Sequence, residues 1–469
     1  MPLPVITAEE MRAWEASTWE SGIAPVEVIE RVGRVLAAEL MRRTRSGDRI
    51  LVVAGPGNNG ADAKACVRFL TDRQVVVVDA TEPVSATGQL QDELSEPPDW
   101  IVDGVFGIGL NRPLDPAWAG LVDTLNRFRS FRVSIDVPSG LDATTGAVLG
   151  TAVQADETWT LGAPKTGLTV PTASAFTGRV RLFPDIGLRG RPRASGGLLW
   201  SVPGDFVGFP PRRPVDGHKG TFGHVTLLVG SQGYHGAAVL AARGALRARP
   251  GLTTLIVQPE ILAVVAAQLS APMVRSWTAN LRLPENATSV VIGPGLAAKD
   301  LPVPFRDLAS RTWREHEGAV LADASALDWL PPRSGLSSTL RVVTPHPGEA
   351  ADMLDTTVKK VLADRVGSLR EISRRLGNAW VVLKGFQTLV GRAEGPVWVN
   401  PTGNPGLGQG GTGDVLAGVL GGLLAQSRLA AMPERTLAYA VWEHGAAADR
   451  LEEASRNWSA EELNAEVGR

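Results

Sequence analysis

The chain contains little cysteine, little net charge and no long hydrophobic run. Cys66 is the only cysteine among 469 residues, so no intrachain disulfide can form, which is usual in a reducing cytosol. The 47 basic and 49 acidic residues leave a formal charge of −2, so no overall basic field attracts nucleic acid or anionic lipid. Residues 1–10 lack the pattern of a signal peptide, and the apolar stretch 415–425 is too short to cross a bilayer. We therefore expect a cytoplasmic protein with no nucleic-acid or membrane partner.

The order of the apolar segments predicts α/β architecture. With 44% hydrophobic and 20% charged residues, the composition is that of an ordinary globular protein, and the length suits two or three domains. Short β-branched runs alternate with helix-like segments, which is typical of doubly wound sheets. In the first half we expect helices at 7–41, 62–70 and 118–128, and strands at 49–54, 75–78, 100–102 and 133–137. In the second half we expect strands at 225–229, 252–257, 290–292, 319–321, 342–344, 381–383 and 397–399.

A stretch rich in proline, glycine and arginine interrupts this alternation at 184–217, and we interpret it as a linker between domains. The predicted fold class is therefore α/β, with two three-layer α/β/α domains. The first domain is expected at 1–210 and the second at 211–469.

Three loops in the first half carry polar residues beside the ends of expected strands. The glycine-rich segment 55–60 includes Asn59, and later strands are followed by Asp103 and by the loop that contains Asp136 and Ser139. Ligands of open parallel sheets bind beyond the carboxyl ends of the strands, so these loops are expected to converge on one crevice. Their hard oxygen atoms suit a small cation such as Mg²⁺ or K⁺.

The strongest pattern of the second half is the glycine-rich segment 400–414, which leads directly into an apolar helix. Residues 411–413 would present backbone N–H groups at the helix start, where they can stabilise a phosphoryl group during transfer. Asp414 at the edge of this loop can deprotonate an attacking hydroxyl. Phosphoryl transfer requires little beyond such positioning and charge stabilisation.

Other polar residues of the second half also follow expected strands. Lys384 can reach the phosphates of a nucleotide, and Asp323 can orient water or Mg²⁺. Two prolines stiffen the loop around His346 and could direct the ring toward a substrate. A further loop at a strand end, 293–295, consists of glycine, proline and glycine.

Plainer structural interpretations of these residues remain open. Segment 55–60 could be only a turn capped by Asp62, and the glycines before Asp414 could form a flexible turn capped by that aspartate. Lys384 could be a solvated lysine at a strand end, and an isolated histidine such as His346 more often has a structural role.

Three motifs of the first half resemble those of the NAD(P)H-hydrate epimerase family over roughly residues 7–185. They are Asn58-Asn-Gly60, Asp103-Gly-Val-Phe-Gly107 and Ile135-Asp-Val-Pro-Ser-Gly140. The resemblance implies a Rossmann-like domain in which Asp136 transfers protons. It implies a potassium ion at Asn59, Asp103 and Ser139, and hydrate-binding residues at Asn58, Asn59, Gly60, Asp62, Gly107, Gly109 and Asp136.

This chain departs from the family pattern at two positions that follow the Asn58-Asn-Gly60 motif. The family usually has glycine where this chain has Ala61 and Ala63. If either position requires a positive φ, alanine strains the loop, and if either lies against the ligand, the methyl group crowds it. Either effect would make the epimerase slow, altered or lost, and the sequence leaves open whether one of them occurs.

The motifs of the second half resemble the ADP/ATP-dependent NAD(P)H-hydrate dehydratases, which have a ribokinase-like fold, over about residues 215–455. The matching segments are 218–225, 236–238, 293–296, 344–349, 383–385 and 410–418. The resemblance implies that Asp414 is the general base and that Mg²⁺ assists. Residues Ala237, Ala238, Gly295, His346 and Asp414 would bind the hydrate, and residues Lys384, Gly385, Phe386, Gln387, Thr388, Gly411, Thr412 and Gly413 would bind the nucleotide. Two positions depart from the family, Ala297 for a glycine and Ser325 for an aspartate.

Together the two resemblances imply repair of NADH hydrate and NADPH hydrate. One domain would interconvert the two epimers, and the other would dehydrate one of them at the expense of ADP or ATP, with the choice of nucleotide open. Homo-oligomers are common in these families and are expected here. Two alternatives remain, a ribokinase-like kinase for a vitamin alcohol and a first domain that binds dinucleotides without catalysis.

Overall fold

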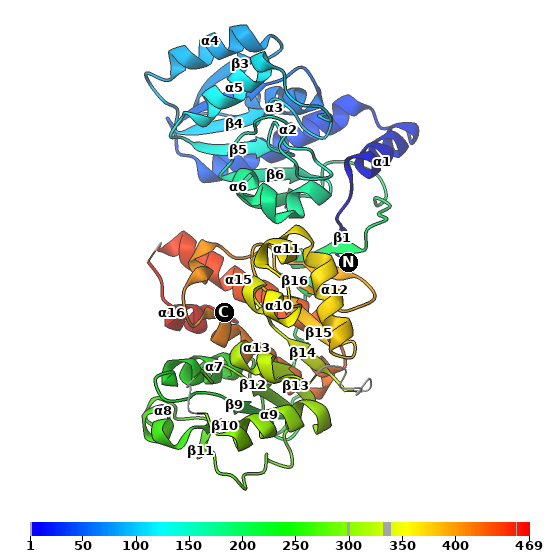
Figure 1. The fold of residues 1–469 in the computed structure, drawn as a ribbon. Helices are drawn as coiled ribbons and strands as arrows, with labels where there is room; N and C mark the ends of the chain where they lie inside the picture. Colours follow the sequence, from blue (N-terminus) through cyan, green and yellow to red (C-terminus); the bar gives the residue numbers. More distant parts are fainter. Residues whose placement is uncertain (1, 298–300, 332–338, 456) are drawn as a thin grey trace. The chain divides into compact units, whose positions relative to one another are not determined.

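The chain folds into two compact units, which are described separately. The structure is a computed structural model that describes residues 2–297, 301–331, 339–455 and 457–469. The N-terminal unit comprises Leu3–Trp200 and the C-terminal unit Ser201–Arg469 (Figure 1). This division lies within the expected linker 184–217.

The N-terminal unit is built on a parallel sheet. Its strand order is β3 (Gln74–Asp79), β2 (Arg49–Ala54), β4 (Trp100–Gly104), β5 (Phe131–Ile135), β6 (Glu157–Leu161) and β7 (Arg179–Phe183). The chain changes direction across the sheet between β2 and β4, as in flavodoxin-type doubly wound sheets. The loops after these two strands therefore flank a crevice at the topological switch point. A short antiparallel pair, β1 (Leu3–Pro4) with β8 (Leu198–Trp200), lies outside this sheet.

Helices cover both faces of this sheet because its central strands are apolar on both sides. On β2, Ile50, Val52 and Ala54 pack into one core with residues of α1 (Ala8–Glu20), α2 (Pro25–Arg43) and α3 (Asn58–Val67). The alternate residues, Leu51 and Val53, pack into a second core with residues of α4 (Pro83–Glu93) and α5 (Pro116–Asn126). The short α6 (Ser174–Thr177) precedes β7. The three-layer arrangement predicted from the sequence is confirmed.

Two of the expected helices are divided or begin differently in the structure. The single helical segment expected at 7–41 is two helices, because the chain turns at Gly22, whose φ is +92°, and restarts at Pro25. The helix expected from residue 62 begins four residues earlier, at Asn58. The Asn-Asn-Gly motif therefore forms the first turn of α3, and Asp62 lies in its second turn and not in its first.

The C-terminal unit has a mixed sheet with a parallel centre. The strand order is β17 (Val397–Val399), β16 (Leu389–Gly391), β15 (Trp380–Leu383), β14 (Arg341–Val343), β13 (Ala319–Ala322), β12 (Ser289–Ile292), β9 (His224–Leu228), β10 (Leu252–Val257) and β11 (Met273–Ser276). Strands β15, β16 and β17 pair antiparallel, and the others pair parallel. Strands β11 and β16 were not predicted from the sequence.

Ten helices are described in this unit. They are α7 (His235–Arg247), α8 (Leu262–Gln268), α9 (Val303–Glu315), α10 (Pro347–Met353), α11 (Val358–Ala363), α12 (Arg365–Arg375), α13 (Thr412–Leu424), α14 (Ser427–Ala430), α15 (Pro433–Ala454) and α16 (Ala460–Glu466). Helices α7 and α13 pack closely because Gly244 and Gly418 face the partner backbone, where a Cβ would overlap carbonyl oxygens. Helix α13 is buried along most of its length. In the described part of the chain, no helix has the length and apolar character that a membrane span requires.

Candidate functional sites

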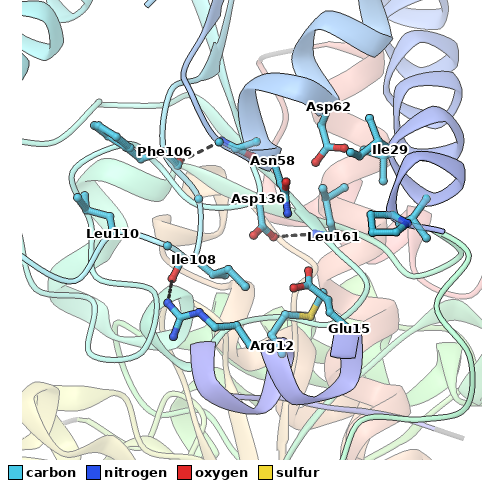
Figure 2. Close-up of a pocket in the computed structure, with 18 of the residues that line it drawn as sticks. Arg12, Glu15, Ile29, Asn58, Asp62, Phe106, Ile108, Leu110, Asp136 and Leu161 are labelled. Atoms are coloured by element: carbon cyan, nitrogen blue, oxygen red, sulfur yellow. Dashed lines mark hydrogen bonds between the residues drawn. The ribbon is translucent and has the colours of Figure 1, made fainter. Parts of the chain in front are cut away.

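A cavity of about 630 Å³ lies at the switch point of the N-terminal sheet. Its walls come from α1 and α2, from the first turns of α3, and from the loops after β4 and β5 (Figure 2). The lining includes six of the residues that the sequence singled out for substrate binding: Asn58, Asn59, Asp62, Gly107, Gly109 and Asp136. The loops therefore converge as expected from the sheet topology.

The start of α3 depends on two glycines. A Cβ on Gly60 would overlap the carbonyl oxygen of Gly55, and a Cβ on Gly55 would overlap the backbone of Val105. The substitutions at Ala61 and Ala63, by contrast, lie inside the helix and not at positive φ. Neither alanine is among the residues that line the cavity, and the methyl group of Ala63 is buried beside Gly104. The expected strain and crowding at these two positions are therefore absent.

Asp136 projects into the cavity from an unusual backbone conformation. Its φ is +66°, which ends β5 at Ile135, two residues before the expected end at residue 137. Its Oδ1 accepts a hydrogen bond of 3.1 Å from the Leu161 N–H and forms an ion pair with Lys165. The Lys165 side chain is fully buried, and its Nζ also donates to the Leu161 carbonyl oxygen at 2.7 Å. A non-glycine residue held at positive φ by several such contacts is typical of a functional site.

Two more carboxyl groups face the same space as Asp136. Figure 2 shows Glu15, from α1, and Asp62, from α3, turned toward it. Burial raises the pKa of Asp62 well above its usual value, and repulsion by Asp136 and Glu15 adds to the rise. The pKa of Glu15 is raised by burial and then by Asp136. The cavity therefore combines a carboxylate in an ion pair with carboxyl groups that tend to keep a proton.

A compact oxygen-rich cluster adjoins the cavity. Asp103 is completely buried, and its carboxylate accepts hydrogen bonds from the hydroxyls of Ser139 at 2.6 Å and Ser134 at 2.7 Å. Burial raises the pKa of Asp103, against the effect of these hydrogen bonds. Asn59 donates to the carbonyl oxygen of Phe106 at 3.0 Å, and the Phe106 N–H donates to Ser139 Oγ at 2.8 Å. Carboxylate, hydroxyl, amide and carbonyl oxygens are the ligand types that hard cations prefer.

Lys165 and Glu15 are site residues that the sequence did not single out. Lys165 follows β6, a strand that was not predicted because three of its five residues are polar. Its position after a strand would have identified it if the strand had been recognised. Glu15 lies on a surface helix, where a glutamate usually faces solvent, so nothing in the sequence marks it.

In the C-terminal unit, residues at the carboxyl ends of several parallel strands lie together. After β12, Gly295 has a φ of +68°, and a Cβ there would come within 2.8 Å of the Ala237 methyl group at the start of α7. The hydroxyl of Ser231, after β9, donates to the Gly295 carbonyl oxygen at 2.7 Å. The neighbouring Ala238 is fully buried and packs toward Gly230.

The glycine-rich loop before α13 is ordered by its own hydrogen bonds. Gly411, with a φ of +98°, caps the helix, and the Thr412 hydroxyl donates to the carbonyl oxygens of Leu407 at 2.8 Å and Gln409 at 3.1 Å. Nε2 of the buried His444 lies 3.0 Å from the Thr412 carbonyl oxygen. Burial lowers the pKa of His444 to about 4, so the ring is neutral at pH 7 and its Nε2–H donates this bond. A fixed helix start of this kind directs first-turn N–H groups at a ligand.

Three charged groups gather in front of this helix start. Lys384 Nζ lies 2.8 Å from Asp323 Oδ1 and 3.8 Å from Glu349 Oε2. Burial opposes the charge of Lys384, but the carboxylates of Asp323, Glu349 and Asp414 outweigh it and raise the pKa of the lysine. Burial and the Asp323 charge raise the pKa of Asp414 to about 7, against the effect of Lys384. Lys384 is thus a partly buried partner of carboxylates and not a fully solvated surface lysine.

The segment after Lys384 has a fixed and irregular backbone. Gly385 has a φ of +129° and Gln387 a φ of +52°, and the Thr388 hydroxyl donates to the Gly385 carbonyl oxygen at 3.1 Å. The buried Arg365 donates to the carbonyl oxygens of Phe386 at 2.6 Å and Gln387 at 3.2 Å. The Phe386 ring is exposed.

The structure gives His346 a structural role. Its Nδ1 accepts hydrogen bonds from the N–H groups of Gly348 at 3.0 Å and Glu349 at 3.2 Å, and it caps α10 in this way. The structural interpretation of His346 therefore accounts for Nδ1, one of its two ring nitrogens. The other ring nitrogen, Nε2, lies 3.5 Å from Glu349 Oε1.

Comparisons with known proteins agree with this arrangement. The family model described as NAD(P)H-hydrate dehydratase matches residues 225–467, and the model described as YjeF-related protein N-terminus matches residues 26–87 and 79–167. A protein of Gloeobacter violaceus named bifunctional NAD(P)H-hydrate repair enzyme is 35% identical, over 95% of this chain and 93% of its own length.

Two solved structures resemble part of this chain. A ribokinase-like superfamily protein from Enterococcus faecalis covers 60% of this chain and 97% of its own, with 23% identity and a TM-score of 0.50, and it shows the fold. An ADP/ATP-dependent NAD(P)H-hydrate dehydratase from Bacillus subtilis, co-crystallised with ATP and Mg²⁺, is 30% identical over 55% of this chain and 91% of its own, with a TM-score of 0.49. The chain belongs to the family of bifunctional NAD(P)H-hydrate repair enzymes.

Proposed function

We propose that this chain restores NADH and NADPH from their hydrates in two steps, epimerisation in the N-terminal unit and nucleotide-dependent dehydration in the C-terminal unit. The observation that carries the proposal is the placement of Asp414, with a pKa of about 7, beside Lys384 and at the start of α13. A base poised near neutrality next to a group of anion-binding N–H donors suits phosphoryl transfer to a hydroxyl.

In the dehydratase step, Asp414 takes the proton of the hydrate's hydroxyl as that oxygen attacks the terminal phosphorus of ADP or ATP. Residues Gly411, Thr412 and Gly413 hold the transferring phosphoryl group through backbone N–H groups, and Lys384 balances its charge. The lone pair of the ring nitrogen then expels phosphate from the neighbouring carbon. Loss of a proton from the next carbon restores the dihydropyridine. Ala237 and Gly295 would border the nicotinamide, and the 385–388 segment would hold the nucleotide.

The described residues contain no cluster of three His, Cys, Asp or Glu side chains that could hold a metal ion by itself. The carboxylates of Asp323 and Asp414 nevertheless offer hard oxygen atoms where nucleotide phosphates would lie. We infer that Mg²⁺ enters with the nucleotide, since this ion commonly binds through one or two carboxylates plus substrate phosphates. Bound there, Mg²⁺ would neutralise phosphate charge.

In the epimerase step, the groups around the N-terminal cavity divide the proton transfers. Asp62, whose pKa is raised well above its usual value, protonates the departing hydroxyl, and the ring nitrogen's lone pair assists the departure. Asp136, paired with Lys165, takes the proton of the water that returns to the opposite face. Pairs of carboxyl groups whose surroundings separate their proton affinities are typical of acid–base sites. Asn59, Asp103 and Ser139 would hold a potassium ion, which would supply positive charge beside the cavity.

Two variants test this assignment with a mixture of NADH hydrate epimers, ADP or ATP, and Mg²⁺. With Asp136→Asn, recovery of NADH absorbance should stop rapidly at about half the hydrate, because only one epimer enters dehydration. With Asp414→Asn, rapid recovery should be lost while the epimers still interconvert. The reverse pattern, or equal loss of both reactions in both variants, would contradict the division of labour.

A further inference from the structure

A second cavity, of about 560 Å³, lies in the C-terminal unit and has no role in the proposed function. Its walls come from residues 210–214, from the segment before β9, from the turn after α7, from the end of α13 and the start of α14, and from α15. We call it the arginine cavity after five of its lining residues: Arg212, Arg213, Arg247, Arg249 and Arg428.

The arginine cavity is far from the nucleotide loops. Thr412 begins α13 at the proposed phosphoryl-transfer site, and Val419 and Leu423, further along the same helix, line the arginine cavity. At about 1.5 Å per residue, these two residues lie about 10 Å and about 17 Å along the helix axis from Thr412. A ligand in this cavity would therefore occupy a separate site.

The positive charge of this cavity is concentrated and not compensated by its lining. The whole chain has a formal charge of −2, so five arginines in one hollow do not reflect a basic composition. Glu443 is the one carboxylate among the lining residues, and it already accepts hydrogen bonds from Arg450 at 2.9 Å and from the Gly468 N–H at 3.0 Å.

The arginines are partly fixed before any ligand binds. Arg247 donates to the Asn464 carbonyl oxygen at 2.7 Å, and the Arg213 guanidinium lies 4.0 Å from the centroid of the Phe222 ring. Burial lowers the pKa of Arg213, and repulsion by Arg249 adds to this effect. Arg249 itself has a φ of +58°, a backbone conformation that few residues other than glycine adopt without strain.

Helix ends explain only part of this charge. Helices α7 and α13 end beside the cavity, and a helix C-terminus carries a partial charge equivalent to about −0.5. Two such ends offset about one unit of positive charge, which leaves most of the charge of the five guanidinium groups to a ligand or to solvent. Planar guanidinium groups bind phosphate through paired hydrogen bonds, and the cavity volume is in the range of small-molecule sites.

We propose that the arginine cavity binds a small molecule with a chain of two or more phosphate groups, and that it does so independently of the phosphoryl-transfer site. The aromatic ring of Phe222, already stacked on Arg213, gives the site one apolar wall. The assignment does not depend on the repair activity.

Calorimetric titration of the full chain with inorganic tripolyphosphate tests this proposal. The Arg249→Ala/Arg428→Ala double variant removes two exposed guanidinium groups and should bind at least tenfold more weakly. Arg314→Ala, which removes an exposed arginine from α9 outside the cavity, should bind like the wild type. Lys384→Ala should retain the same binding, because it changes only the phosphoryl-transfer site. Thermal unfolding of each variant controls for folding, and the single charge reversal Arg428→Glu serves if the double variant is unstable.

Several results would overturn the proposal. The wild type could fail to bind tripolyphosphate, or the double variant could bind it as tightly as the wild type. Loss of tripolyphosphate binding in Lys384→Ala would place the ligand at the phosphoryl-transfer site. Orthophosphate in place of tripolyphosphate should bind at least tenfold more weakly. Equal affinity for both would show a simple anion site and would refute the requirement for linked phosphates.

Discussion

The pH dependence of dehydration should report the ionisation of Asp414. Burial and the Asp323 charge raise the pKa of Asp414 to about 7, and only the ionised form can accept the hydroxyl proton. At one pH unit below that pKa, about one tenth of the groups are ionised, so kcat/KM should be about one tenth of its plateau value. For each further pH unit, kcat/KM should fall about tenfold again.

The structure also predicts how a bound nucleotide changes this profile. The phosphates add negative charge beside Asp414, which disfavours its ionised form, so the acid limb of kcat should lie at higher pH than that of kcat/KM. The assay follows NADH absorbance from the purified reactive epimer between pH 5.5 and 8.5 at constant ionic strength.

Replacement of the base gives the matching control. Asp414→Asn should lower kcat by about 10²–10⁴-fold, the usual contribution of a positioned general base, and should abolish the acid limb. A rate that does not change between pH 6 and 8, or an asparagine variant that retains more than a tenth of the rate, would refute the role assigned to Asp414.

Three further predictions concern stability and the epimerase. Folding raises the pKa of Asp414 from 3.8 to about 7. Its favourable contribution to the free energy of unfolding is therefore full below pH 3.8 and is lost as the pH rises through 7. Asp414→Asn should unfold at a higher temperature than the wild type at about pH 8, with no such gain at about pH 3.5. Lys165→Met should slow epimerisation, measured by epimer exchange, by at least tenfold through loss of the Asp136 ion pair, with dehydration unchanged. Reverting Ala61 and Ala63 to glycine should lower the free energy of unfolding by roughly 1 kcal/mol for each residue, because glycine weakens a helix interior, with no gain in epimerisation. A gain would show that the methyl groups obstruct the site.

Much of the fold could be predicted because its strands are apolar runs bounded by glycine or polar residues. The expected bounds of β2, β10 and β17 agree with the structure residue for residue. Strand β6 was missed because Glu157, Thr158 and Thr160 are polar although they are fully buried or nearly so. Glu157 is compensated by Arg43 and Arg181, which are distant in the sequence, and no local pattern can reveal such partners.

The candidate sites show the same division between local and tertiary information. Glycine and aspartate motifs marked the loops that meet at each sheet edge, because sheet topology fixes where those loops converge. The first motif was read as a loop although it is helical, so the backbone strain considered for Ala61 and Ala63 does not arise. Lys165 was missed with its strand, and the capping role of His346 depends on a backbone geometry that spacing alone leaves open.

The balance between recovered NADH and released phosphate tests the central claim most directly. Wild-type protein, NADH hydrate, Mg²⁺ and either ADP or ATP would be incubated together, and absorbance, phosphate and any phosphorylated organic product would be followed. We expect one phosphate released for each NADH recovered, with complete recovery from mixed epimers and no stable phosphorylated product. A stable phosphorylated compound, or no recovery with either nucleotide, would contradict it.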